Sequence, residues 1–169
     1  MIASFFKDLS QPEYIHVLIN PLPVYGLAMG VIGLIIALTQ RSRPAQVATL
    51  ALILLSGAVA WPVVHYGEEG YDRVLSMSDD QGQAWLKVHE HRADELAWGF
   101  YVLACLAAAA ILVPIKWPKS TTPLTVLTLL LSFVILGIGG YIAHAGGKIR
   151  HREFRNEPAP PVPAEQDER

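Results

Sequence analysis

Six histidines are the residues of this sequence best suited to cofactor chemistry: His16, His65, His89, His91, His144 and His151. A neutral imidazole nitrogen binds Fe, Cu or Zn, while a carboxylate or a carbonyl commonly holds the second ring nitrogen. Imidazoles from facing helices of a bundle hold haem b or a transition metal in this way. Carboxylates that could supply the second contact are close by in the sequence, at Glu90, Asp94, Glu95 and Glu153.

Two of these histidines, His65 and His144, stand at the ends of apolar runs, where an imidazole without a partner is costly. In the segment 87–95, a helix would put His91 and Glu95 four residues apart on one face. That arrangement would orient a metal ligand. It equally suits the solvated start of a helix, where acids are favoured near the positive end of the helix dipole. For all six histidines, the alternative to ligand binding is that they only form hydrogen bonds at the membrane interface.

Four apolar segments must position the histidines: Val17–Thr39, Gln46–Tyr66, Leu96–Ile115 and Pro123–His144. Each has the roughly 17–25 residues that a transmembrane helix needs, and none contains Asp, Glu, Lys or Arg. The chain of 169 residues is 52% hydrophobic and 17% charged, a balance that fits a protein solvated by lipid. Because lipid offers the backbone no hydrogen-bond partners, we expect an all-α integral membrane four-helix bundle.

The connections Arg41–Ala45 and Lys116–Thr122 are short, which predicts two antiparallel hairpins and places both termini and all histidines on one membrane face. The longer connection Gly67–Glu95 alternates acids with apolar residues. It predicts a short interfacial helix between the second and third spans, interrupted near Asp79, Asp80 and Gly82. Residues 1–155 would form the transmembrane domain, and the Pro-rich acidic tail 156–169 would be disordered.

Three prolines near one depth, Pro21, Pro23 and Pro62, remove backbone donors from the first two helices. Either the two helices are kinked and neighbouring helices satisfy the freed carbonyls, or the irregular backbone lines a polar cavity. Basic residues without acids in the two short loops favour a cytoplasmic position for those loops, although a count of all basic residues favours the reverse. We therefore expect a bacterial inner-membrane protein with its histidine face in the periplasm.

Several classes of function are disfavoured. A net charge of −2 leaves no basic stripe for a phosphate backbone, so nucleic acid is not an expected partner. The single cysteine, Cys105, excludes an intrachain disulfide, and there is no C-x-x-C-H pattern for covalent haem. The sequence also lacks H-E-x-x-H, a phosphate loop and G-x-S-x-G, so no enzymatic reaction is assigned.

Four stretches of the chain resemble a bacterial family of small four-helix membrane proteins related to domain of unknown function 2231: Ile15–Gly26, Trp61–Gly67, Val88–Glu90 and Ala145–Glu153. The most specific stretch is Gly-Gly-Lys-Ile-Arg-His-Arg-Glu, from Gly146 to Glu153. Relatives are expected to carry a histidine where this chain has Pro21, so no role of that histidine transfers. The resemblance implies no established activity, but related domains joined to cytochrome c or Rieske modules imply an electron-transfer setting by analogy.

The same resemblance implies that the main site residues are His89, Glu90, Arg150, His151 and Glu153. Gly146 and Gly147 can adopt backbone angles closed to other residues, so we expect a sharp turn after the fourth span that brings Arg150 over the bundle mouth. Arg150 would then hold a carboxylate, either that of Glu90 or one on a ligand. The alternative is a structural latch, in which Arg150 pairs with Glu90 and the histidines bind nothing.

The predicted site therefore has two overlapping sets of residues. Haem b would be held by His65, His89, His144 and His151, and a transition metal by His89, Glu90, His91, His151 and Glu153. Two functions fit these predictions. The protein is either a redox component that exchanges electrons with quinone or a larger respiratory complex, or a cofactor-free accessory subunit of such a complex. A transporter is disfavoured, because the spans carry no charge for a coupled pathway.

Overall fold

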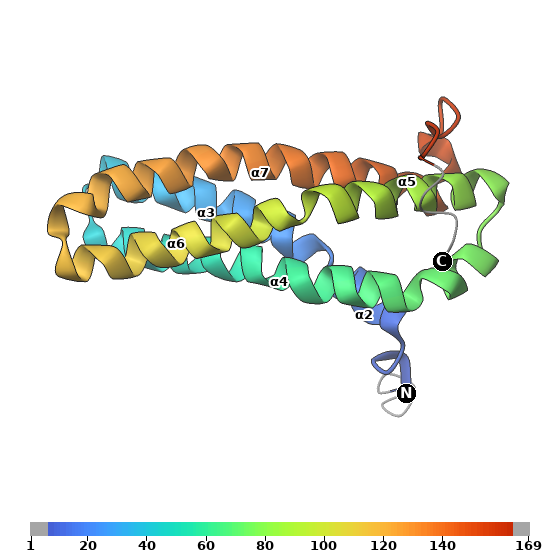
Figure 1. Ribbon diagram of the computed structural model, residues 1–169, viewed down its shortest axis with the longest axis horizontal. Coiled ribbons are helices and arrows are strands. Elements are labelled where there is room, and N and C mark those ends of the chain that lie inside the picture. Colours follow the sequence, from blue (N-terminus) through green and yellow to red (C-terminus); the bar gives the residue numbers. More distant parts are fainter. Residues whose placement is uncertain (1–6, 164–169) are drawn as a thin grey trace.

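The computed structural model describes residues 7–163, and it is an elongated bundle of helices (Figure 1). The elements are α2 (Pro12–Ile19), α3 (Pro21–Thr39), α4 (Arg43–Ser76), α5 (Asp80–Leu96), α6 (Trp98–Lys116), η1 (Pro118–Ser120), α7 (Thr121–Arg150) and η2 (Arg152–Phe154). Among the described residues there is no β-strand. The all-helical class predicted from the sequence is therefore confirmed.

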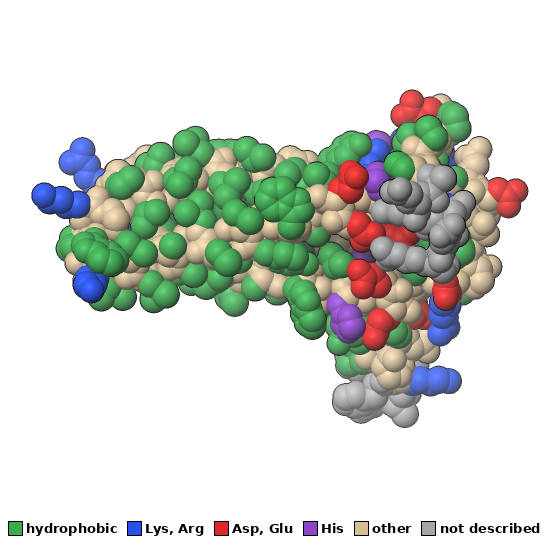
Figure 2. Space-filling view, viewed as in Figure 1, with side chains coloured by type: hydrophobic (Ala, Val, Ile, Leu, Met, Phe, Trp, Pro, Cys, Tyr) green, Lys and Arg blue, Asp and Glu red, His purple; other side chains and the backbone are tan. Residues whose placement is uncertain are grey.

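Four helical stretches are long and apolar enough to cross a membrane: Pro12–Thr39, Arg43–Ser76, Asp80–Lys116 and Pro118–Arg150. The visible face is covered by hydrophobic side chains along most of its length, whereas acids and histidines gather at one end (Figure 2). Lysines and arginines mark the opposite end. This distribution is that of a multi-pass membrane bundle with a polar, water-facing end, which we call the histidine end.

The core of the membrane part lies between α3, α4, α6 and α7, around five side chains that are fully buried: Leu27, Leu34, Leu50, Ile53 and Leu103. Small residues allow the helices to approach closely, as they do in membrane bundles generally. A Cβ atom on Gly30 of α3, for example, would lie 2.6 Å from Cγ1 of Ile53 on α4. The bundle is therefore tightly packed below the histidine end.

In the connection between the second and third spans, α4 continues to Ser76, and α5 starts at Asp80 and is followed almost directly by α6. An interfacial position for a helix in this connection stays a prediction. The side chain of Asp79 caps α5 by accepting a hydrogen bond of 2.8 Å from the backbone N–H of Gly82. The interruption predicted near Asp79 is thus the junction between two long helices. A second apolar cluster, formed by Trp85, Leu86, Val88, Ala145 and Ile149, packs α5 against α7.

The chain does not turn at Gly146 and Gly147, so that expectation is wrong. Both lie inside α7, which continues to Arg150, and no described glycine has a positive φ. The turn comes at His151, where the segment His151–Pro163 leaves the helix; we call this segment the C-terminal strap. Its part after Arg155 has no helix or strand, yet Ala159 and Val162 pack against the second apolar cluster. Disorder of the tail stays a prediction, and residues 164–169 lie outside the described range.

The arrangement of α4 predicts opposite sidedness for two loop positions. Ser42 precedes this 34-residue helix and Ser78 follows it, so about 50 Å of helix separates them at 1.5 Å per residue. Single cysteines at these positions, in a Cys105→Ser background, should react with a membrane-impermeant maleimide from opposite sides of the membrane. Labelling of both positions from the same side would contradict the four-span architecture.

Candidate functional site

A cavity of about 480 Å³ opens at the histidine end, between α2, α4, α5 and α7. Its lining includes Ala60, Phe100 and Gly139. Most of its lining is apolar, and its volume is within the roughly 300–1,000 Å³ typical of small-molecule and cofactor pockets. The polar groups that reach into such a pocket are the ones that select its ligand.

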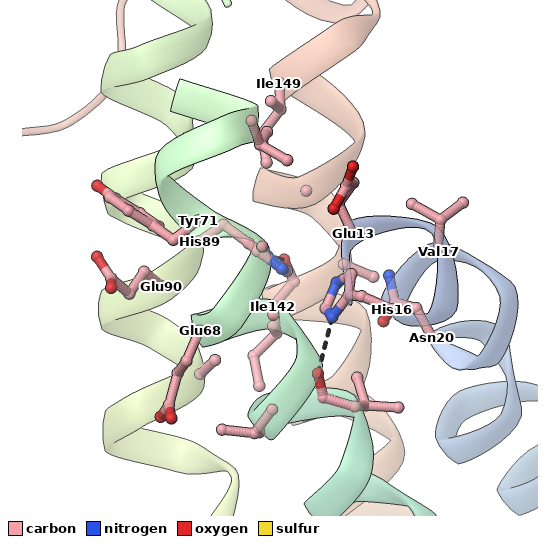
Figure 3. Close-up of a pocket in the computed structure, with 18 of the residues that line it drawn as sticks. Glu13, His16, Val17, Asn20, Glu68, Tyr71, His89, Glu90, Ile142 and Ile149 are labelled. Atoms are coloured by element: carbon pink, nitrogen blue, oxygen red, sulfur yellow. Dashed lines mark hydrogen bonds between the residues drawn. The ribbon is translucent and has the colours of Figure 1, made fainter. Parts of the chain in front are cut away.

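Two histidines reach into this cavity from opposite sides, His16 from α2 and His89 from α5 (Figure 3). Their ring centres are 6.3 Å apart and their ring planes are nearly perpendicular, at 82°. The residues are distant in sequence and belong to different helices. Their meeting is therefore a product of the fold, and it brings two imidazoles to one point in the pocket.

Each of the two rings is held by a backbone carbonyl. Nδ1 of His16 is 2.7 Å from the carbonyl oxygen of Val63, and Nδ1 of His89 is 3.0 Å from that of Ile142. A carbonyl can only accept a hydrogen bond, so Nδ1 carries the proton in each neutral ring and Nε2 keeps its lone pair. Histidines that bind metals through Nε2 have their second nitrogen fixed by a carbonyl or carboxylate in the same way.

Two glycines make these contacts sterically possible. Gly67 lies four residues after Val63 on the same face of α4, and a Cβ atom there would lie 2.9 Å from Nδ1 of His16. Gly146 lies four residues after Ile142 on α7, and its Cβ would lie 3.1 Å from Cε1 of His89. The role of Gly146 is thus to leave space for the ring of His89. Gly147 makes no comparable approach to either histidine.

The same arrangement occurs twice because the chain contains an internal repeat. The stretch Val63-Val-His-Tyr-Gly67 corresponds to Ile142-Ala-His-Ala-Gly146, 79 positions later. His16 and His89 are 73 positions apart. In α3 and α6 the buried positions recur at that spacing of 73: Leu27/Phe100, Gly30/Leu103, Val31/Ala104, Leu34/Ala107 and Ala37/Ala110.

The two long helices α4 and α7 repeat at the other spacing of 79, with buried pairs Gln46/Thr125, Ile53/Ser132, Ser56/Ile135, Ala60/Gly139 and Gly70/Ile149. The packing follows the same rule, since α2 packs on α4 as α5 packs on α7, and α3 packs on α4 as α6 packs on α7. The protein is therefore built from two similar halves. His16 and His89 occupy equivalent positions in them and face each other across the join.

Four of the six histidines lie outside this cavity. His65 stacks on Trp61 with ring centres 5.4 Å apart, and its Nε2 is 3.6 Å from Glu69. The ring of His144 meets the ring of Trp85 edge-on at 6.2 Å. These two are the repeat-equivalent histidines of α4 and α7, and each contacts a tryptophan. Of the four haem ligands predicted from the sequence, only His89 therefore lies at the cavity.

The predicted metal ligands are also dispersed. His91 is 3.6 Å from Glu95, and the exposed His151 is 2.9 Å from Glu153. A hydrogen bond from its own backbone amide and the neighbouring His151 hold the pKa of Glu153 below its usual value. Among residues 7–163, no three His, Cys, Asp or Glu side chains are grouped closely enough to hold a metal ion.

Two other predicted residues do line the cavity, Glu90 and Arg150. One guanidinium nitrogen of Arg150 donates to the carbonyl oxygen of Met77 at 3.2 Å, at the water-facing end of the pocket. The residue that sequence reasoning left out of the site is His16. Its signal was the internal repeat, which pairs His16 with His89 and repeats the x-x-His-x-Gly pattern of their docking helices. No known protein family, curated protein or solved structure matches the chain at a significant level.

Proposed function

We propose that His16 and His89 are the two axial ligands of one haem b, and that the protein is an electron-transfer component of a bacterial inner membrane. The observation that carries the proposal is the pair of facing imidazoles in one cavity, each with Nδ1 bound to a carbonyl. The predicted hairpin topology, with the histidine end in the periplasm, is part of the same proposal.

The separation of the two rings supports a shared metal centre. A metal–nitrogen bond is about 2.0–2.1 Å long, and the ring centre lies roughly 1.1 Å beyond Nε2. Two imidazoles on opposite sides of one metal therefore have ring centres about 6.3 Å apart. The observed separation is 6.3 Å. A nearly perpendicular orientation of the ring planes is compatible with two bonds along one line, because each ring can rotate about its own bond.

The number of protein ligands favours haem over a bare ion. A zinc or similar ion takes about four ligands in a closed protein site, whereas the described part of the chain offers two histidines at this point and no group of three. Haem needs only axial ligands from the protein. The cavity of about 480 Å³ is mainly apolar, as the porphyrin face requires. Arg150 at its water-facing end is placed to meet acidic substituents.

Haem with both axial positions filled by histidine transfers single electrons and leaves no site on iron for a substrate. The residues of this chain would fix the two rings, exclude water and keep both Nε2 lone pairs directed inward. Electron exchange with quinone or a larger respiratory complex follows as the physiological setting. The resemblance to the family related to domain of unknown function 2231 agrees with that setting and remains a hypothesis.

The test is the absorbance spectrum of the protein purified from a haem-sufficient bacterial host. We expect a Soret band and, after reduction, the sharp visible bands of six-coordinate haem b, with one haem per chain. Protein isolated colourless should acquire the same bands on titration with hemin. A colourless protein that binds no added hemin would overturn the proposal, and its stoichiometric co-purification with a larger complex would establish the accessory-subunit function instead.

A further inference from the structure

The two helices that carry the facing histidines are held very differently. The helix of His89, α5, has 17 residues, a side-chain cap at Asp79 and five buried residues: Gly82, Trp85, Leu86, Val88 and Arg92. The helix of His16, α2, has eight residues, no side-chain cap and none buried. Equivalent positions in the two halves of the repeat therefore have unequal support. His89 belongs to a helix that has buried residues of its own, and His16 belongs to a short helix that has none.

The junction between α2 and α3 has the construction of a hinge. Asn20 separates the two helices, and Pro21 and Pro23 follow it. Neither proline has an N–H to donate, so the carbonyls of Val17 and Ile19 receive no helical hydrogen bond from them. Two of the backbone bonds that would make α2 a stiff continuation of α3 are thus missing. Rotation at this junction costs less than bending an intact helix.

The contacts that hold α2 in place are made mainly with one neighbour, α4. His16 binds the carbonyl of Val63, and Glu13 Oε1 lies 2.9 Å from Nε of the half-exposed Arg73. Gly70 lets the backbone of Glu13 come close, since a Cβ there would lie 2.9 Å from the Cα of Glu13. Release of these contacts would free α2 as a unit and leave α3 to α7 in contact with one another.

The helix α2 also forms one wall of the cavity. Four of its residues and the junction residue Asn20 line the pocket; the four are Glu13, Tyr14, His16 and Val17. Val17 is also 70% exposed on the outer surface. This wall is therefore one side chain thick at that point, and its displacement would open the pocket sideways. The opposite wall contains α5, whose buried residues anchor it.

We infer that α2 is the gate of the cavity: it swings about Asn20–Pro21 to admit the planar metalloporphyrin, and closes when His16 returns to Val63 and Glu13 pairs with Arg73. This inference rests on the proposed haem site. Entry is ordered, because His89 is in place before the ligand arrives and His16 arrives with the closing helix. The ligand is first held by one histidine and then trapped by the second.

A cross-link between α2 and α4 tests the gate. Glu13→Cys and Arg73→Cys are introduced together in a Cys105→Ser background and joined by a short bifunctional maleimide, either before or after hemin is added. Cross-linking before hemin should slow uptake, and cross-linking after hemin should slow loss to apomyoglobin, each by roughly tenfold or more as the open population falls. The same protein without cross-linker is the first control. The pair His65→Cys and Glu69→Cys, within α4 alone, controls for the reagent.

A second variant reports the opposite change without a cross-linker. Arg73→Gln removes the ion pair that latches α2, and should speed both uptake and loss by about two- to fivefold, the range expected for an exposed pair, while the final spectrum is unchanged. Arg152→Gln, at a more exposed ion pair on the strap, should alter neither rate. Unchanged rates in both the cross-linked and the Arg73→Gln proteins would overturn the gate. Failure of every form to bind hemin would instead refute the haem site itself.

Discussion

Alanine at His16 or at His89 is expected to abolish the six-coordinate haem spectrum. In the proposed site each ring is one of two protein ligands, so the loss of either imidazole would leave one side of the metal without a histidine. The remaining histidine would leave a five-coordinate centre. We expect hemin affinity to fall at least roughly 100-fold, beyond the 10–100-fold cost of altering outer-shell partners of a ligand. Hemin titration followed by absorbance in the reduced and oxidised states measures both effects.

The repeat provides matched controls for this experiment. His65 and His144 are equivalent to each other, lie within a few residues of the docking carbonyls and sit outside the cavity. Alanine at either one should leave the spectrum and the stoichiometry intact. Helical content by circular dichroism should be unchanged in all four variants. Retention of the six-coordinate spectrum by either His16→Ala or His89→Ala would contradict the assignment of the axial ligands.

Replacement of Arg155 by alanine is expected to lower the free energy of unfolding by about 1–3 kcal/mol, the cost of leaving part-buried hydrogen-bond partners unpaired. Its side chain is only 5% exposed. It donates to both carboxylate oxygens of Asp79, at 2.7 and 3.0 Å, and to the carbonyls of Lys148 and Ile149, at 2.7 and 2.6 Å. It thus ties the strap, the end of α7 and the cap of α5 together. Equilibrium unfolding in mixed micelles measures the loss.

The neighbouring Arg152 is the control, because it reaches the same carboxylate of Asp79 from an exposed position, with 77% of its side chain accessible. Its replacement by alanine should change stability by less than about 1 kcal/mol. A loss as small for Arg155→Ala as for Arg152→Ala would show that the hydrogen bonds of Arg155 do not hold the strap to the fold.

The effect of Arg155→Ala should also depend on pH in a defined direction. A hydrogen bond from the Gly82 amide, together with Arg155, holds the pKa of Asp79 below its ordinary value of 3.8. A carboxyl whose pKa is lower in the folded state contributes stability above the unfolded value and loses it as pH falls through the folded value. The difference between wild type and variant should therefore be constant near neutrality and shrink below about pH 4. A difference that grew on acidification would contradict this account.

The membrane-spanning segments could be predicted from the sequence because their signal is local. About 20 uncharged apolar residues in a row have few alternatives to a membrane helix. The helices at the histidine end had no such signal. Residues 67–95 are polar enough to suggest an interfacial connection, yet α4 and α5 extend through most of them because Asp79 caps α5 and Trp85 anchors it against α7. The cap at Asp79 and the burial of a few side chains therefore decided the structure of this segment more than its polar composition did.

The site was only partly predictable for a related reason. The sequence predicts His89, but it gives this histidine other partners: His65, His144 and His151 for haem b, and His91 and His151 with nearby acids for a metal, because carboxylates are common second contacts of ligands. The structure supplies backbone carbonyls instead, and these are invisible to a search for side-chain types. Gly146 shows the same limit, since a glycine that admits a neighbouring ring has the same letter as one that permits a turn.

The two-part construction of the chain has a consequence for its ancestry. Each half contains two long helices and returns the chain to the end of the bundle at which it began (Figure 1). A unit with an even number of crossings can be copied in tandem without inverting the second copy, so both copies deliver their histidine to the same side. An odd number would have sent the second histidine to the far side of the membrane. Once the two copies are fused, their sequences can diverge. One histidine helix can then become buried and fixed while the other stays short and without buried residues.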